Sequence, residues 1–293
     1  MPKTVAYLGL GTMGGAMGNN LVKAGYTVRG YDPSPEACAR AEKSGILIFS
    51  SPAEATAVAD VVCSSVPVPE DVVEAYTGET GVLVGAAEGT VCFDFSTITP
   101  EVSQEVAAEA RKRGVFFLDT PVGGSAPHAA EALLTVLVGG DKDAMEKHRD
   151  VLEAVSRSIT YVGPNGAGLR MKLIANHLVS GQLCLLAEGL TLGRKAGLDV
   201  EQLVEYLLGS AVSEIMRVKG REMGRKDYTP TFKVDLMAKD LRLVAAMAES
   251  VKAPIPFSAL TKQVFTGTQA LGHGSDDQNA VREYFERVAG LNA

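Results

Sequence analysis

The sequence predicts an α/β protein with a doubly wound, mostly parallel sheet, followed by an all-α domain that opens with a long helix. Two observations support this fold class. Short apolar runs alternate with amphipathic segments over the first part of the chain, up to about residue 160, which is typical of a parallel sheet covered by helices. After the Gly-Pro-Asn-Gly turn at 163–166, no segment reads as a convincing strand. At about 150 residues per domain, 293 residues predict two domains, which we divide into 1–163 and 164–293.

The predicted elements follow from hydrophobic periodicity and from the positions of proline and glycine. We expect strands at 4–8, 27–32, 46–49, 61–66, 91–95, 115–118, 134–138 and 159–162. We expect helices between them at 14–24, 35–43 and 100–113. In the second domain we expect helices at 168–195, 200–208, 213–223, 233–251, 256–271 and 277–289.

The composition of the chain limits the classes of function that it can have. The chain has 28 Lys plus Arg and 35 Asp plus Glu, and the net charge of −7 argues against nucleic acid as a partner. No run of 18 apolar residues predicts a membrane span, and the start does not resemble a signal peptide. Four scattered cysteines without a CxxC pair, and only four histidines, predict reduced, buried thiols, a cytoplasmic location and no metal site.

A glycine-rich turn predicts a dinucleotide site. Gly9, Leu10, Gly11, Thr12, Met13 and Gly14 form a G-x-G-x-x-G run between the first strand and the helix that follows it. Gly9 permits the tight turn, Gly11 lets a pyrophosphate approach the backbone, and Gly14 lets helix and strand pack closely. The helix N-terminus then offers N–H groups to the phosphates. This order of elements predicts a Rossmann-type domain that binds NAD or NADP.

Asp32 ends the second strand, 18 residues after Gly14, near the position of a ribose-binding acid. Its carboxylate would accept a hydrogen bond from the ribose 2′-hydroxyl and repel a 2′-phosphate, which favours NAD over NADP. We expect Arg29, the nearest cation on that strand, to face solvent.

The long helix carries a polar stripe. Gly168, Lys172 and Asn176 are spaced at i, i+4 and i+8 and therefore share one face. Spacing alone favours a lysine whose stem lies on the helix edge and whose amine reaches solvent over a catalytic lysine.

In four blocks along nearly the whole chain, the sequence resembles the β-hydroxyacid dehydrogenases, the family of 3-hydroxyisobutyrate dehydrogenase and tartronate and glyoxylate/succinic semialdehyde reductases. The blocks are the glycine-rich turn with its paired methionines, the Asp-Thr-Pro-Val-Gly-Gly-Ser segment at 119–125 with the strand after it, Gly-x-Gly-x-x-x-Lys-x-x-x-Asn at 166–176, and Lys-Asp-Leu at 239–241. Their joint order is far more specific than any one motif.

The resemblance implies roles for individual residues. Lys172 would be the general acid/base, Asn176 would orient the substrate, and Lys239 would reach substrate and cofactor. Pro67 and Thr97 would lie along the nicotinamide half of the cofactor. The substrate carboxylate would be held by the backbone of a loop comprising Val122, Gly123, Gly124 and Ser125.

The chain departs from the family in this loop, where Gly-Gly-Ser at 123–125 stands in place of Ser-Gly-Gly. The hydroxyl at position 123 is lost, and Ser125 is a candidate to replace it. His177, where the family often has a second asparagine, is expected to be a packed, hydrogen-bonded histidine rather than a proton shuttle.

The resemblance implies hydride transfer between nicotinamide and a small β-hydroxy acid or its semialdehyde, in a homodimer or homotetramer. A free lysine titrates near ~10.4, so Lys172 suits proton donation during reduction and must lose its proton first during oxidation. Two alternatives stay open. One is a reductase of a sulfonated or phosphorylated aldehyde that uses Arg170, and the other is a nucleotide sensor without activity on the same fold.

Overall fold

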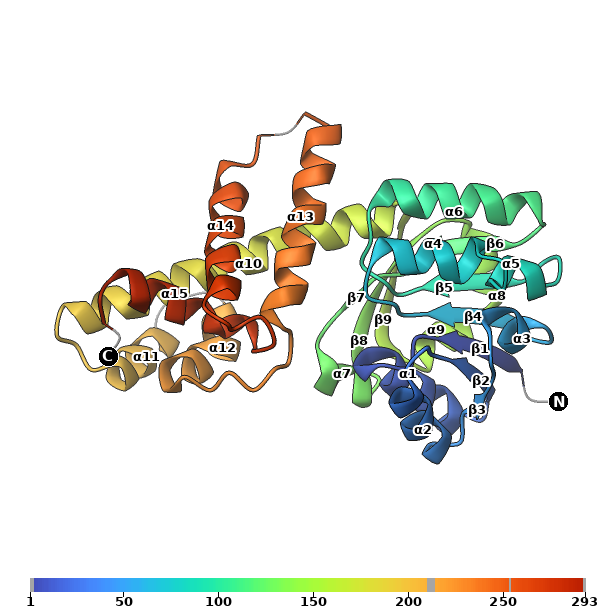
Figure 1. Cartoon of the computed structure of the whole chain (residues 1–293), viewed down its shortest axis with the longest axis horizontal. Helices are drawn as coiled ribbons and strands as arrows, with labels where there is room; N and C mark the ends of the chain where they lie inside the picture. The colour runs from blue at the N-terminus through green and yellow to red at the C-terminus, as the bar shows by residue number, and fades with distance from the viewer. Residues whose placement is uncertain (1–2, 210–213, 253, 292–293) are drawn as a thin grey trace. The chain divides into compact units, whose positions relative to one another are not determined.

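The computed structural model describes residues 3–209, 214–252 and 254–291, and these residues form two units that divide between Lys172 and Leu173. The first unit is built on one nine-stranded sheet with the order β3-β2-β1-β4-β5-β6-β8-β7, and β9 pairs with β8 (Figure 1). The strands are β1 (Thr4–Leu8), β2 (Thr27–Tyr31), β3 (Leu47–Ile48), β4 (Val61–Ser64), β5 (Val91–Asp94), β6 (Phe116–Asp119), β7 (Val122–Gly123), β8 (Leu134–Gly139) and β9 (Ser156–Gly163).

Pairing within the sheet is mostly parallel, as predicted. Strands β1 to β6 are all parallel, and β9 is parallel to β8. The exception is β8, which is antiparallel to both β6 and β7. The order 3-2-1-4-5-6 reverses between β1 and β4, and ligands of open α/β sheets bind outside the carboxyl ends of the strands at such a point.

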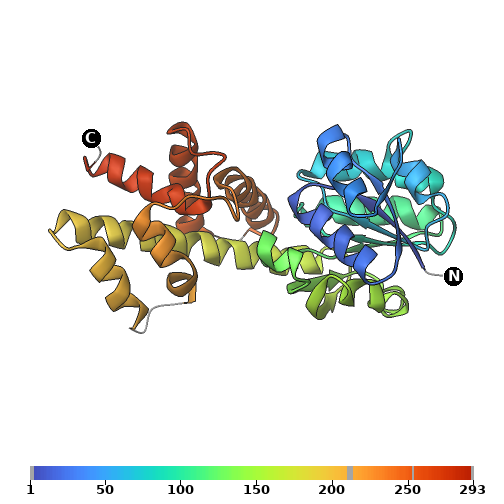
Figure 2. The same ribbon diagram turned by 90° about the horizontal axis from the view of Figure 1, so that it is seen from below.

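Helices cover both faces of the sheet. Residues of α1 (Thr12–Lys23) and α2 (Pro35–Lys43) share one core with α7 (Ala126–Ala130), α8 (Lys142–Lys147) and α9 (Arg149–Glu153). The other face packs against α3 (Pro52–Thr56), α4 (Pro69–Thr77), α5 (Val82–Gly85) and α6 (Pro100–Lys112). Seen from below, the blue helices α1 and α2 lie in front of the sheet (Figure 2).

Several of these elements were not predicted. Helices α3, α4, α5, α7, α8 and α9 span only four to nine residues, too few for a clear helical period. Strand β7 has two residues, and its antiparallel pairing depends on β8, which is distant in sequence. The strands predicted at 27–32, 61–66 and 91–95 end one or two residues earlier than expected, at turns that carry the candidate site.

The described part of the second unit is helical. It continues α10 (Ala167–Lys195) and contains α11 (Val200–Leu208), α12 (Glu214–Arg225), α13 (Val234–Ser250), α14 (Pro256–Ala270), the short 3₁₀ turn η1 (Gln278–Ala280) and α15 (Val281–Val288). Its core joins side chains of α10 such as Leu183 and Leu190 with Met237 of α13 and Phe265 of α14. The start of the predicted helix at 213–223 lies outside the described residues.

Helix α10 runs through the division as one continuous helix (Figure 2). By length and composition alone, this 29-residue helix could cross a membrane, but the core helix of a soluble protein passes the same test. The predicted boundary at residue 163 falls in the turn before α10, whereas the contacts divide at residue 172, because the first turns of α10 pack on the sheet.

Candidate active site

The glycine-rich turn lies between β1 and α1, on the carboxyl side of the sheet. Gly9 has a φ of +83°, and a Cβ there would overlap the carbonyl oxygen of Ser65, in the loop after β4. A Cβ on Gly14 would overlap the carbonyl oxygen of Gly9, so this glycine lets α1 approach the turn. Gly11 differs from both, because no atom beyond its own chain neighbours lies within 4 Å of where its Cβ would be.

Open space at Gly11 fits a dinucleotide. Gly11 is the N-cap of α1 and offers no side-chain cap, so the first N–H groups of the helix face the same open side. A phosphate held there would gain from those N–H groups and from the helix dipole. The turn therefore suits the phosphates of a nicotinamide dinucleotide.

Asp32 lies beside this turn, and its carboxylate is already oriented. One oxygen accepts from the backbone N–H of Leu10 at 2.6 Å, and the other accepts from the N–H of Ser34 at 2.8 Å. A carboxylate oxygen has two lone pairs, so each still has room for a ribose hydroxyl.

Arg29 is half-buried, and its guanidinium is bonded to the protein instead of simply facing solvent as expected. Its guanidinium donates to the carbonyls of Glu54 and Ala55 at 2.7 and 2.8 Å and stacks 3.6 Å from the ring centre of Phe49. The sequence could not show this, because the partners lie on α3 and beside β3, and α3 was not predicted. The guanidinium of Arg29 therefore holds α3 against β2.

The loops after β4 and β5 carry Pro67 and Thr97. They are joined where Ser96 accepts from the backbone N–H of Val66 at 2.9 Å. Ser96 also donates to the buried carboxylate of Asp94 at 2.6 Å, and Ser64 donates to the same oxygen at 2.8 Å. Burial raises the pKa of Asp94 to about 6, although the hydrogen bonds from the two serines oppose that shift.

The predicted carboxylate loop follows β6. Gly124 has a φ of +125°, which only glycine adopts readily, and a Cβ there would lie 2.8 Å from Leu134. A Cβ on Gly123 would overlap the hydroxyl of Thr135, so Thr135 fills the space that a side chain at 123 would need. Ser125, considered as a substitute hydroxyl, pairs instead with Nδ1 of His128 at 3.0 Å at the start of α7.

In the second unit, Asp240 connects two of the predicted residues. The amide of Asn176 donates to one oxygen of the Asp240 carboxylate at 2.6 Å, and the ammonium of Lys239 lies 2.9 Å from the other oxygen. Asp240 is buried, so these interactions are little weakened by water. Because Nδ2 of Asn176 is held by Asp240, its Oδ1 is the atom left to face a ligand and would accept a hydrogen bond.

Asp240 was not predicted, although it stands in the quoted Lys-Asp-Leu block. His177, next to Asn176, is half-buried, and its Nδ1 is buried without a hydrogen-bond partner, which differs from the hydrogen-bonded histidine expected. Lys172 lies on α10 one turn before Asn176, at the last position of the first unit. Within the described ranges, no group of three or more His, Cys, Asp or Glu side chains could hold a metal ion.

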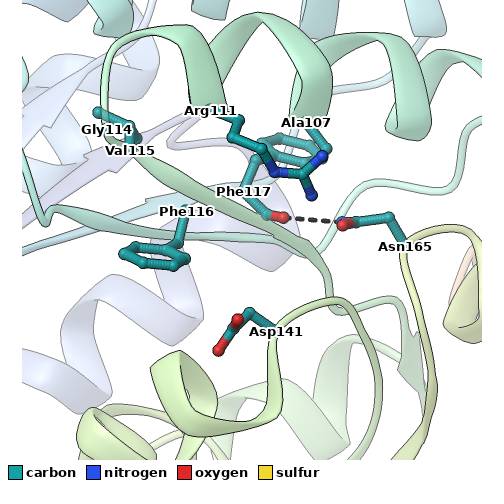
Figure 3. A pocket seen from close by; sticks show the side chains of 8 residues that line it. All are labelled: Ala107, Arg111, Gly114, Val115, Phe116, Phe117, Asp141 and Asn165. Carbon is teal, nitrogen blue, oxygen red and sulfur yellow. Dashed lines mark hydrogen bonds between the residues drawn. The ribbon is translucent and has the colours of Figure 1, made fainter.

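A separate cavity of about 110 Å³ lies between α6, β6 and the turn before α10. Its lining includes Arg111, Phe116, Asp141 and Asn165, and none of the predicted site residues contributes to it (Figure 3). The candidate site is therefore the edge of the sheet described above, not this cavity.

The glycine-rich turn of the sheet suits a dinucleotide, and in the helical unit Lys239 and Asn176 both bond to Asp240. Together these features define the class of an NAD(P)-dependent dehydrogenase. Residues 4–163 match the sequence model of the NAD-binding domain of 6-phosphogluconate dehydrogenase. Residues 166–285 match the model described as NAD-binding of NADP-dependent 3-hydroxyisobutyrate dehydrogenase.

Individual relatives are similar over nearly the whole chain. The mitochondrial 3-hydroxyisobutyrate dehydrogenase of Mus musculus is 33% identical, over 96% of this chain and 86% of the mouse protein. The NAD-dependent L-serine dehydrogenase of Pseudomonas aeruginosa is 33% identical, over 98% and 99%. A solved structure of Mycobacterium tuberculosis 3-hydroxyisobutyrate dehydrogenase with L-serine is 34% identical, covers all of both chains and has a TM-score of 0.89.

The chain belongs to the 3-hydroxyisobutyrate dehydrogenase-like β-hydroxyacid dehydrogenase family. It is an NAD(P)-dependent enzyme of that family, which sets aside the alternative of a sensor without activity.

Proposed function

We propose that the enzyme interconverts a small β-hydroxy acid and its semialdehyde, with Lys172 as general acid/base. The observation that carries the proposal is the arrangement on α10, where Lys172 is one helical turn from an asparagine whose orientation Asp240 fixes. Relatives named for 3-hydroxyisobutyrate and L-serine support a short hydroxy acid as the substrate. Both compounds carry a carboxylate and a hydroxyl on the β-carbon.

Each group of the chain would have a separate role in the reaction. The bound nicotinamide supplies or accepts the hydride. Lys172 would give its proton to the carbonyl oxygen during reduction and take the hydroxyl proton during oxidation, a contribution of roughly 10²–10⁴-fold. Oδ1 of Asn176 would accept from the substrate, and the backbone N–H groups of 122–125 would hold its carboxylate.

We further propose that NAD is preferred over NADP. The supporting observations are the orientation of the Asp32 carboxylate beside the turn and the commitment of Arg29 to α3. A 2′-phosphate would then meet the negative charge of Asp32, while the guanidinium of Arg29 is bonded to α3. The ratio of kcat/KM for the two cofactors measures the preference, and equal or better use of NADP would contradict it.

A homodimer or homotetramer is also proposed. The outward face of α10 in the second unit exposes three large apolar side chains, Ile174, Leu178 and Leu185. Exposed apolar patches of this kind commonly mark protein interfaces. Light scattering measures the mass in solution, and a monomer at assay concentration would contradict the proposal.

Replacement of Lys172 tests the main proposal. We expect Lys172→Ala to lower kcat at least ~10²-fold while NADH binding, measured by fluorescence, is retained. The matched control is Arg170→Ala, which removes an exposed cation from the same helix. Turnover near that of the wild type in Lys172→Ala would contradict the role of the lysine. A loss in Arg170→Ala would favour the reductase of a sulfonated or phosphorylated aldehyde.

A further inference from the structure

Asp119, at the end of β6, is fully buried and has no role in the chemistry described so far. Its Oδ1 accepts from the backbone N–H of Gly166 at 2.6 Å and from the hydroxyl of Ser103 at 3.2 Å. Its Oδ2 accepts from the backbone N–H of Leu169 at 3.1 Å. Both oxygens of one carboxylate thus bind the start of α10, whose first N–H groups have no partners within the helix.

Two glycines make room for this carboxylate. A Cβ on Gly168 would lie 2.9 Å from Oδ2 of Asp119 and 2.7 Å from the carbonyl oxygen of Leu137. A Cβ on Gly139, on β8, would lie 2.6 Å from the same Oδ2. The second glycine of the Gly-x-Gly-x-x-x-Lys block is therefore required by its surroundings. The carbonyl oxygen of Leu137 and the carboxylate at the start of the 119–125 block together occupy the space that its side chain would need.

The turn before α10 is held at further points. Asn165 donates from its side chain to the carbonyl of Phe117 on β6 at 2.7 Å, an interaction drawn in Figure 3. Gln104 of α6 donates to the carbonyl of Asn165 at 3.1 Å. Strand β6 thus fixes the turn through Asn165 and the first helical residues through Asp119.

Lys172 is only three residues after Leu169, so about 4.5 Å of helix separates them along the axis. Over so short a distance, the position and direction of the first turn determine where the lysine stem begins. A misplacement of about 1 Å in a catalytic group can cost ~10²-fold in rate.

We propose that Asp119 is a positioning residue: its carboxylate sets the start and direction of α10 and thereby places the amine of Lys172. The inference rests on the proposed role of Lys172. The positioning role requires a carboxylate and not an amide at residue 119. Each oxygen of Asp119 accepts from a backbone N–H, so an asparagine would have to turn its NH₂ group toward one of those donors.

The experiment compares Asp119→Asn, Gly168→Ala and Lys172→Ala with a matched control, Asp141→Asn. Asp141 caps α8 by accepting from the N–H of Ala144 at 2.8 Å, and its replacement makes the same chemical change at another helix start. We expect Asp119→Asn and Gly168→Ala to lower kcat at least ~30-fold and to leave the Kd of NADH within about threefold. The control should stay within about twofold of the wild type in both.

Amide hydrogen exchange provides a readout independent of turnover. Residues 166–172 should exchange faster in Asp119→Asn and in Gly168→Ala, and not in the control. If Asp119→Asn fails to fold, Gly168→Ala carries the same measurements, because its Cβ crowds the carboxylate without removing it.

Three outcomes would overturn the inference. Full turnover in Asp119→Asn and Gly168→Ala, with turnover lost in Lys172→Ala, would contradict the inference alone. Parallel losses of kcat, NADH affinity and melting temperature would make Asp119 merely structural. Full turnover in Lys172→Ala would contradict the proposed function and remove the reason to place that amine.

Discussion

The two units hold their candidate residues in different ways. At the edge of the sheet in the first unit, the binding positions are set by backbone geometry, with glycines at 9, 11 and 14 shaping one turn. Between α10 and α13 in the second unit, the candidate residues Asn176 and Lys239 are polar side chains held by the buried carboxylate of Asp240. A turn of this kind is specified locally, whereas the side-chain arrangement depends on residues 64 positions apart.

The largest loss of stability is expected at Gly14, where an added Cβ would overlap a backbone atom. Gly14→Ala would drive a Cβ into the carbonyl of Gly9, which cannot move aside, and should cost about 3 kcal/mol of unfolding free energy or more. Denaturant unfolding measures that loss, and dinucleotide affinity should fall with it. Unchanged stability would mean that the turn is more adaptable than its geometry indicates.

Gly11→Ala is the matched change on the same turn. Its Cβ would enter open space from a backbone with a φ of −65°, so stability should fall by no more than about 1 kcal/mol, the cost of alanine in place of glycine at an N-cap. The Kd for NADH should nevertheless rise at least ~10-fold, because the added atom occupies the approach of the phosphates. If affinity is kept, the phosphates do not approach the backbone at Gly11.

A smaller effect, confined to the second unit, is expected for Asp240→Ala. Loss of the carboxylate frees the Asn176 amide to rotate and removes the ionic partner of Lys239. Charge-assisted hydrogen bonds contribute roughly 1.5–3 kcal/mol, so the KM of the hydroxy acid should rise ~10-fold or more, with a lesser change in NADH affinity. Asp235→Ala, at an exposed acid on the same helix, serves as the control. A KM no higher than in that control would show that Asp240 does not orient Asn176.

The smallest net effect at neutral pH is expected for replacement of Asp94, a buried carboxylate of the first unit. In the unfolded chain the carboxyl group of Asp94 loses its proton near pH ~3.9. In the folded state the pKa of Asp94 is about 6, so the group keeps its proton up to that pH. Between these values the folded state holds more protons, so this group's contribution to stability falls as pH rises from ~4 to ~6, by up to about 3 kcal/mol.

Asp94→Asn should remove that pH dependence. The three donors to Asp94 share Oδ1, and its Oδ2 is buried without a hydrogen-bond partner, so an amide can keep the accepted bonds. We expect a net change of only about 1 kcal/mol at pH 7, because weaker bonds to the amide offset the relief of a buried charge. Melting temperatures at pH 4.5 and pH 7 measure it. An unchanged slope would assign the pH dependence to other groups.

Sequence reasoning reached the fold class because long strands and helices carry their own period, as in β1 and α10. It missed α4 because nine residues that begin with proline resemble a loop, and it missed the antiparallel placement of β8 because pairing is not local. The bonding of the half-exposed Arg29 was missed for the same reason, since its partners belong to α3.

The candidate site was predictable to the extent that it lies in motifs. Asp119 and Asp240 both stand inside quoted blocks, yet nothing in the sequence shows that one binds the start of α10 and the other the side chain of Asn176. For Asp119 the available signal was an acidic residue directly after the apolar run at 115–118. What it binds depends on the packing of strand on helix, which only the three-dimensional structure shows.

The passage of α10 through both units has a consequence for recombination. An exchange of C-terminal halves between relatives, cut at the turn near residue 163, would bring Lys172 from one parent and leave Asp119 with the other. A cut after Lys172 would keep that pair together, but it would fall inside a continuous helix and separate the lysine from Asn176, about 6 Å further along the axis. Neither crossover point keeps Asp119, Lys172 and Asn176 together from one parent. Functional chimeras should therefore arise mainly between parents that already agree at both Asp119 and the first three turns of α10.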